Sequence, residues 1–188
     1  MTITGPAITR LILLGFVASL LQLTSASQVS IFGVPMDLSP LIVASVGFLA
    51  GSVPGMIFGF CFGLFADTAL MQTLGVTSLV LTVIGYGAGR IRELRDPAHG
   101  LAPVAVGAAA TAIAALGITL LQFLLGVEAP VSAQVVRQIL MTIVINTLLA
   151  LPVYAICRRV LLPFLPDDPR RRRRRAYTTG GLSPLSRA

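Results

Sequence analysis

The stretch GFLAGSVPGMIFGFCFGLFAD, residues 47–67, decides the fold of this chain. Every fourth residue of the stretch is a glycine, and the next step of four reaches an aspartate: Gly47, Gly51, Gly55, Gly59, Gly63 and Asp67. In a helix in water, glycine is less favourable than alanine by about 1 kcal/mol. In lipid, a glycine stripe lets the backbone of a second helix approach closely. The pattern therefore predicts tightly packed membrane helices.

The composition also indicates a membrane protein. Of the 188 residues, 55% are hydrophobic and 11% are charged, and the mean hydropathy is +0.90. Soluble domains contain about 25% charged residues. All fourteen basic residues are arginine, and most lie in short linkers or in a C-terminal run. The net charge of +7 is therefore a signal of membrane topology, and we do not expect nucleic-acid binding.

Six apolar segments approach the length of about 20 residues that a membrane-spanning helix needs. They lie at about residues 8–24, 38–52, 54–70, 74–88, 101–125 and 138–157. We therefore expect an all-α protein, a six-helix transmembrane bundle within residues 1–165, followed by a disordered arginine-rich cytoplasmic tail at 166–188. The second and third segments, hinged at Pro54, could each cross the membrane or form a re-entrant hairpin.

The arginines predict the orientation, because positively charged linkers stay in the cytoplasm. With both termini cytoplasmic, thirteen of the fourteen arginines lie inside and only Arg137 lies outside. The first segment also resembles a signal peptide, whose cleavage would leave five segments and an outside amino terminus. We expect a run of six arginines in the tail to bind anionic lipid or an acidic partner: Arg170, Arg171, Arg172, Arg173, Arg174 and Arg175.

Small residues also close the fourth segment. Gly85 and Gly89, together with Gly55, Gly59 and Gly63, predict that the third and fourth segments pack against each other or against another protein's helix. Tyr86 and Arg90 are expected to anchor the inner boundary of the membrane.

Isolated polar residues in the apolar segments are further candidates. Asp67 would lie roughly 20 Å along a helix from Pro54, near the outer interface, where it could be a functional site, be hydrated, or cap the next helix. Asp37 is expected to be the N-cap of the second segment and to form an acidic outer rim with Asp67. This rim could receive a basic residue of a partner. Asn146 and Gln122 are expected to form hydrogen bonds between helices.

The sequence predicts neither catalysis nor a cofactor or metal. It contains no nucleophile with an adjacent base and orienting group, and no phosphate-binding loop. We therefore expect an interaction protein and not an enzyme.

Four short motifs follow one another along the chain: Pro35-Met36-Asp37-Leu38, the stripe from Gly55 to Asp67, Leu74-Gly75, and Gly85-Tyr86-Gly87-Ala88-Gly89-Arg90. In this order and spacing they resemble the bacterial rod shape-determining protein family MreD. The resemblance covers about residues 8–160.

This resemblance implies an integral-membrane scaffold of the elongation complex in the bacterial cytoplasmic (inner) membrane. The implied partners are MreC, the actin-like MreB, and RodA with its transpeptidase. It also implies a fold akin to the substrate-binding subunits of vitamin-uptake transporters. A small-molecule uptake subunit of that type is the alternative function.

Overall fold

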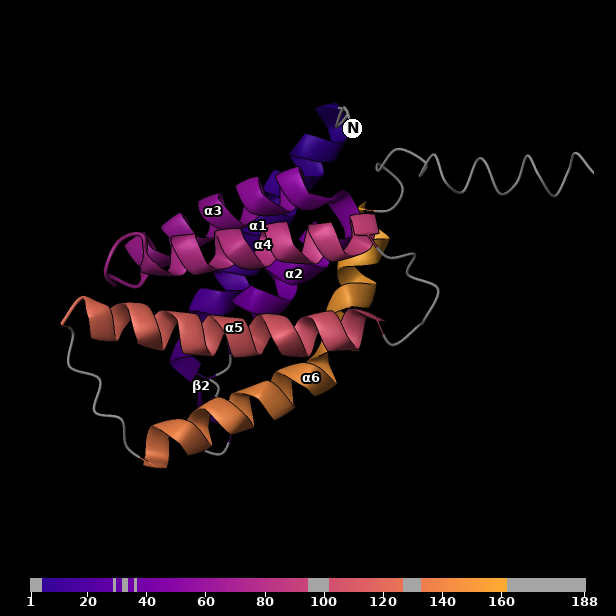
Figure 1. Cartoon of the computed structure of the whole chain (residues 1–188). Helices are drawn as coiled ribbons and strands as arrows, with labels where there is room; N and C mark the ends of the chain where they lie inside the picture. Colours follow the sequence, from indigo (N-terminus) through magenta and orange to yellow (C-terminus); the bar gives the residue numbers. More distant parts are fainter. Residues whose placement is uncertain are drawn as a thin grey trace, which may run out of the picture.

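The computed structural model describes residues 5–28, 30–31, 34–35, 37–94, 102–126 and 133–161. Within these residues the chain forms six helices and one short strand pair (Figure 1). Their bounds are α1 Gly5–Gln28, β1 Ser30–Ile31, β2 Val34–Pro35, α2 Ser39–Ala50, α3 Ser52–Ala69, α4 Val76–Leu94, α5 Ala102–Leu124 and α6 Ala133–Leu161. The predicted all-α class is confirmed, since each strand has only two residues and the antiparallel pair lies between α1 and α2.

Helix α2 forms the centre of the bundle. All twelve of its residues are buried, and all five other helices contact it. A helix that is apolar on every side is stable only when other elements surround it. At 1.5 Å per residue α2 is about 18 Å long, much less than the roughly 30 Å hydrocarbon layer. Its short length is tolerated because it packs against protein and not against lipid.

The break between α2 and α3 lies at Gly51. This residue has a φ of +108°, a conformation that costs glycine little because it has no Cβ. The predicted hinge at Pro54 is therefore wrong. Pro54 is the third residue of α3, where the missing N–H is not required for the helical hydrogen-bond ladder.

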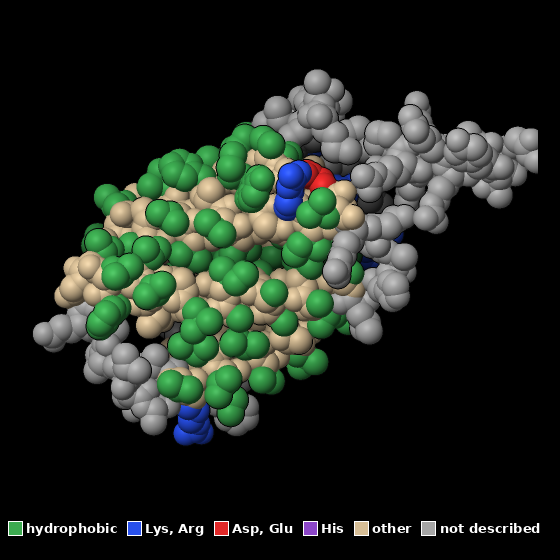
Figure 2. Space-filling view, viewed as in Figure 1, with side chains coloured by type: hydrophobic (Ala, Val, Ile, Leu, Met, Phe, Trp, Pro, Cys, Tyr) green, Lys and Arg blue, Asp and Glu red, His purple; other side chains and the backbone are tan. Residues whose placement is uncertain are grey.

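The helices have the length and surface of a membrane protein. Among the described residues, three stretches are long and apolar enough to cross a membrane: Ser52–Ala69, Ala102–Leu124 and Val136–Leu161. The outward face of α3, α4, α5 and α6 is covered with hydrophobic side chains (Figure 2). Helix α6 changes direction along its length (Figure 1), and Pro152 inside it removes one helical hydrogen bond. The chain is a membrane protein.

Candidate functional site

The glycine stripe lies where α3 meets α4 and α2. A Cβ added to Gly59 would overlap the backbone of Leu81 in α4, and one added to Gly63 would overlap Ser78. Gly55 lies against Gly85, where an added Cβ would be 2.5 Å from the carbonyl oxygen. At the other end of α4, Gly89 packs on the backbone of the α2–α3 break. The absence of side chains therefore allows backbone-to-backbone contact along the whole helix pair.

The glycine stripe predicted close packing against either a helix of this chain or a helix of another protein, and these contacts distinguish the two. All five glycines of the predicted interface are buried, and their close neighbours belong to this chain: Gly55, Gly59, Gly63, Gly85 and Gly89. The stripe is consequently not open to another protein's helix. A partner would have to bind another surface.

Asp67 caps the start of α4. Its side chain is 1% exposed, and its Oδ2 accepts hydrogen bonds from the N–H of Gly75 at 2.8 Å and of Ser78 at 3.4 Å. The first N–H groups of a helix need such acceptors, and the helix dipole favours a carboxylate there. Its Oδ1 has no hydrogen-bond partner among the described residues. Of the three alternatives for Asp67, capping is the one that this geometry supports, and hydration at the outer surface is wrong.

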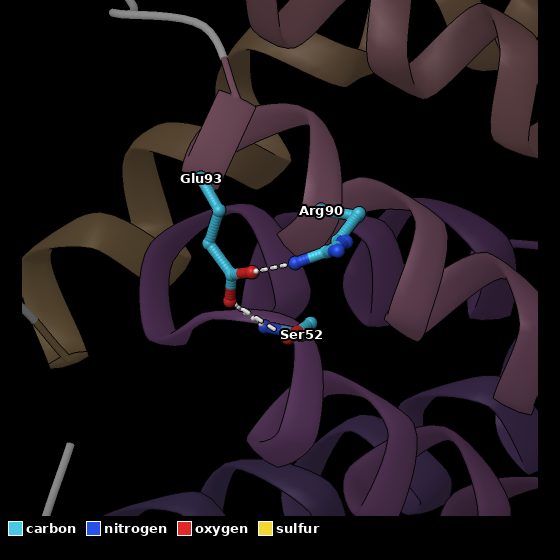
Figure 3. Close-up of polar contacts among 3 residues, drawn as sticks. All are labelled: Ser52, Arg90 and Glu93. Atoms are coloured by element: carbon cyan, nitrogen blue, oxygen red, sulfur yellow. Dashed lines mark hydrogen bonds and ion pairs between the residues drawn. The ribbon is translucent and has the colours of Figure 1, made fainter.

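The C-terminal end of α4 binds the break between α2 and α3. Glu93 Oε1 accepts hydrogen bonds from the backbone N–H of Ser52 at 3.0 Å and from its hydroxyl at 2.7 Å, and thereby caps the start of α3 (Figure 3). The guanidinium of Arg92 donates to the carbonyl oxygen of Leu49 near the end of α2. An anion at a helix start and a cation at a helix end both match the helix dipoles. The bonds from Ser52 hold the pKa of Glu93 below its usual value.

The predicted inner-boundary residues lie near this junction. Arg90 forms an exposed ion pair with Glu93 at 3.2 Å (Figure 3), and exposed pairs of this kind contribute less than about 1 kcal/mol. Tyr86 is 44% exposed on the outward side of α4. Both therefore lie on the surface, whereas Arg92 and Glu93, which carry the helix-capping contacts, were not singled out by the sequence.

A polar cluster joins four helices at the start of α2. Gln22 of α1 donates to Asp37 Oδ1 at 2.9 Å and accepts from the N–H of Leu38 at 3.2 Å. Asn146 of α6 donates to the carbonyl oxygen of Asp37 at 2.8 Å and to Thr111 of α5 at 3.2 Å. Together with Ser39, whose N–H donates to Asp37 Oδ1 at 3.0 Å, these residues form the Asp37 cluster: Gln22, Asp37, Ser39, Thr111 and Asn146.

This cluster changes the predicted role of Asp37. The N-cap of α2 is Leu38, so the predicted N-cap position was wrong by one residue, although the carboxylate still accepts from the first turn. The predicted acidic outer rim is also wrong. Asp37 is partly buried and directed to α1 and α2, while Asp67 is buried against α4. Asn146 forms the predicted bond between helices.

An apolar groove lies on the outward side of the α3–α4 pair. It is open to the outside, has a volume of about 530 Å³, and is lined by residues of both helices and of the turn between them. Its lining consists of Phe60, Leu64, Leu74, Gly75, Ser78, Leu79, Thr82 and Val83. Ser78 also donates to the carbonyl oxygen of Phe60 at 3.0 Å, so the floor of the groove is fixed by a bond between the helices.

The family model of the rod shape-determining protein MreD matches residues 3–160. The chain belongs to the MreD family. This match confirms the resemblance that the sequence motifs predicted over residues 8–160. MreD is a family that determines rod shape and is not a known enzyme family. Comparisons with curated proteins and with solved structures gave no match.

One predicted site of this MreD-family chain cannot be placed. The arginine run Arg170–Arg175 and the rest of the predicted tail, 166–188, lie outside the described residues.

Proposed function

We propose that this protein is an integral-membrane scaffold of the bacterial elongation complex. In this role it docks MreC and helps to couple MreB to peptidoglycan synthesis by RodA and its transpeptidase. The observation that carries the proposal is the MreD family match, which extends over almost the whole helical region. The arginine distribution supports a location in the cytoplasmic (inner) membrane with both termini in the cytoplasm.

The packing supports a scaffold in a second way. The glycines of α3 and α4 contact backbone, and Asp67, Arg92 and Glu93 bind helix ends. These groups therefore contribute to holding the helices in one arrangement. A fixed arrangement presents a constant outer surface, which is what a docking protein requires.

The groove on α3 and α4 is the surface that we propose for the membrane helix of MreC. The glycine stripe is covered within the chain, so a partner has to bind outside it. The groove is the outer side of the same helix pair, and its lining is mainly apolar. A helix bound in the groove would gain van der Waals contacts with its lining, and such packing drives helix association in lipid.

A pair of matched substitutions tests this docking surface. Val83→Phe fills the groove, whereas Val144→Phe makes the same change on the exposed face of α6. Overfilling a contact costs about 1–3 kcal/mol, so we expect Val83→Phe to reduce co-purification with MreC at least about fivefold. Val144→Phe should leave it unchanged. Equal co-purification for both variants, at equal membrane levels, would refute docking in the groove.

The alternative, a small-molecule uptake subunit, requires a cavity lined by several convergent polar groups. Two small cavities between the described helices each have a volume of about 10 Å³, enough for one water molecule. No geometry described above favours this alternative. A small molecule retained through purification and identified by mass spectrometry would favour it.

A further inference from the structure

The Asp37 cluster lies at the depth of the hydrocarbon layer. Asn146, which binds the backbone of Asp37, lies twelve residues before Arg158 and nine residues after Arg137 on α6. These separations correspond to about 18 Å and about 14 Å of helix. The arginines mark the two ends of the membrane segment of α6, so the cluster lies well inside a layer of about 30 Å.

The length of α2 places Asp37 at the same depth. Its last turn lies at the junction held by Arg92 and Glu93, and its first residue lies about 18 Å away. Asp37 therefore lies about 10 Å below the opposite surface of the hydrocarbon layer. An ionisable side chain at such a depth is costly and indicates a functional role.

The groups around Asp37 are neutral. The side chains that reach it or its backbone are the amides of Gln22 and Asn146 and the hydroxyl of Ser39, and α5 contributes the hydroxyl of Thr111 to the cluster. Within its described residues, α5 has no charged side chain. The described charged residues of the other helices lie at helix ends or bind other groups: Arg10, Asp67, Arg90, Arg92, Glu93, Arg137, Arg158 and Arg159.

The cluster also contains a buried acceptor without a donor. The Asn146 side chain is 1% exposed, and its amide nitrogen makes two hydrogen bonds, to Asp37 and to Thr111. Its Oδ1 has no donor among the described residues. Thr111 uses its own hydroxyl hydrogen on the carbonyl oxygen of Gly107 at 3.0 Å. One buried acceptor of the cluster is therefore unpaired, on the side chain that binds the backbone of Asp37.

We propose that the Asp37 cluster is a proton-binding site and that the Asp37 carboxyl is neutral at pH 7. A carboxylate that is partly buried in an apolar layer without a cationic neighbour gains stability by binding a proton. The partly exposed side of Asp37 gives this proton a way in and out. No other reactant is required, because the step is one protonation of one carboxylate oxygen.

The proton also affects the attachment of α1. The described buried side chains of α1 are Ala18, Ser19 and Gln22, and several of its large apolar residues are exposed. Gln22 connects α1 to Asp37 and Leu38 through two hydrogen bonds. A change in the charge of Asp37 therefore changes the contact that holds the end of α1 to the core.

Infrared spectroscopy of the full chain in lipid nanodiscs tests the proposal. At pH 7 we expect the carbonyl band of a protonated carboxylic acid, which disappears in Asp37→Asn and fades in the wild type as the pH is raised. Asp67→Asn is measured beside it, because Asp67 is the other aspartate among the described residues, and the band that belongs to Asp37 is the one that Asp67→Asn leaves unchanged. The melting temperature of the wild type should fall as the pH rises, and that of Asp37→Asn should not.

Two results would overturn the proton site. One is a wild-type spectrum without a protonated carboxyl band at pH 7, and the other is a band that persists in Asp37→Asn. If Asp37→Asn does not fold, Gln22→Leu provides the second measurement. This variant removes a hydrogen bond to Asp37 Oδ1 and should shift the band, whereas an unshifted band would contradict the assignment.

Discussion

Alanine substitutions at Gly85 and Gly87 test the close approach of α3 and α4 with a matched pair on one helix. A Cβ on Gly85 would overlap the carbonyl oxygen of Gly55 and lie 2.6 Å from its carbonyl carbon. Nothing lies within 4 Å of the same atom on Gly87. Both variants therefore gain the same methyl group, but only one methyl group meets another backbone.

The expected difference follows from two opposing effects. Alanine is more favourable than glycine in a helix by about 1 kcal/mol, and this gain applies to both positions. Overpacking costs about 1–3 kcal/mol, and we expect the upper end for Gly85 because the opposing atoms are backbone and cannot rotate away. Gly85→Ala should therefore be destabilised by about 2 kcal/mol and Gly87→Ala stabilised by about 1 kcal/mol.

Equilibrium unfolding of the purified protein in detergent micelles measures this difference. The two variants should differ by about 3 kcal/mol in free energy of unfolding, or on the order of a hundredfold in the folded-to-unfolded ratio. Gly55→Ala should add a further loss to Gly85→Ala in the double variant, because its Cβ would also lie 2.5 Å from the Cα of Gly47 in α2, an overlap that separating α3 from α4 does not relieve. If Gly85→Ala proves as stable as Gly87→Ala, the packing argument for the glycine stripe fails.

Two further predictions concern the helix ends. The pKa of Glu93 is held below its ordinary value of 4.5, so its contribution to stability is complete above that pH and is lost as the pH falls through the lowered pKa. Acid titration followed by thermal unfolding should therefore show a decrease in stability as the pH falls through this lowered pKa, and the decrease should be smaller in Glu93→Gln; identical titrations would contradict the capping role. Asp67→Leu should destabilise the protein by about 1–3 kcal/mol, because it leaves the N–H groups of Gly75 and Ser78, at the start of α4, without their acceptor. Asp67→Asn keeps an acceptor and should cost less, and an equal loss in both variants, measured by unfolding in detergent, would contradict this reading.

The helices could be predicted from sequence because their signals are local. Apolar runs and glycine spacing are both read within about twenty residues, and they predicted all six helices; the largest errors are the end of α4, predicted six residues too early, and the start of α6, predicted five residues too late. The glycine stripe also predicted a close helix neighbour. It could not say whether that neighbour was α4 or a partner, because glycine supplies the space and not the identity of what fills it.

The helix caps and the Asp37 cluster could not be predicted in the same way. Ser52 and Glu93 are 41 residues apart in sequence, and Asp37 and Asn146 are 109 residues apart. Whether a lone polar residue binds lipid headgroups, water or another helix depends on these distant pairings. The prediction of an acidic outer rim was wrong for this reason. It placed Asp37 and Asp67 from the ends of their own apolar segments and did not include the distant groups that bind them.

The central position of the short helix α2 explains why this chain keeps its few polar residues where it does. The start of α2 lies within the membrane, where water cannot reach its free N–H groups, and each such group is costly in lipid. Arg92 binds the C-terminal end of α2, Asp37 binds its N-terminal end, and Glu93 caps the adjacent start of α3. Substitutions of these residues should therefore lower stability and partner binding together. Substitutions in the α3–α4 groove should lower partner binding alone, and this separation distinguishes a role in the fold from a role in the complex.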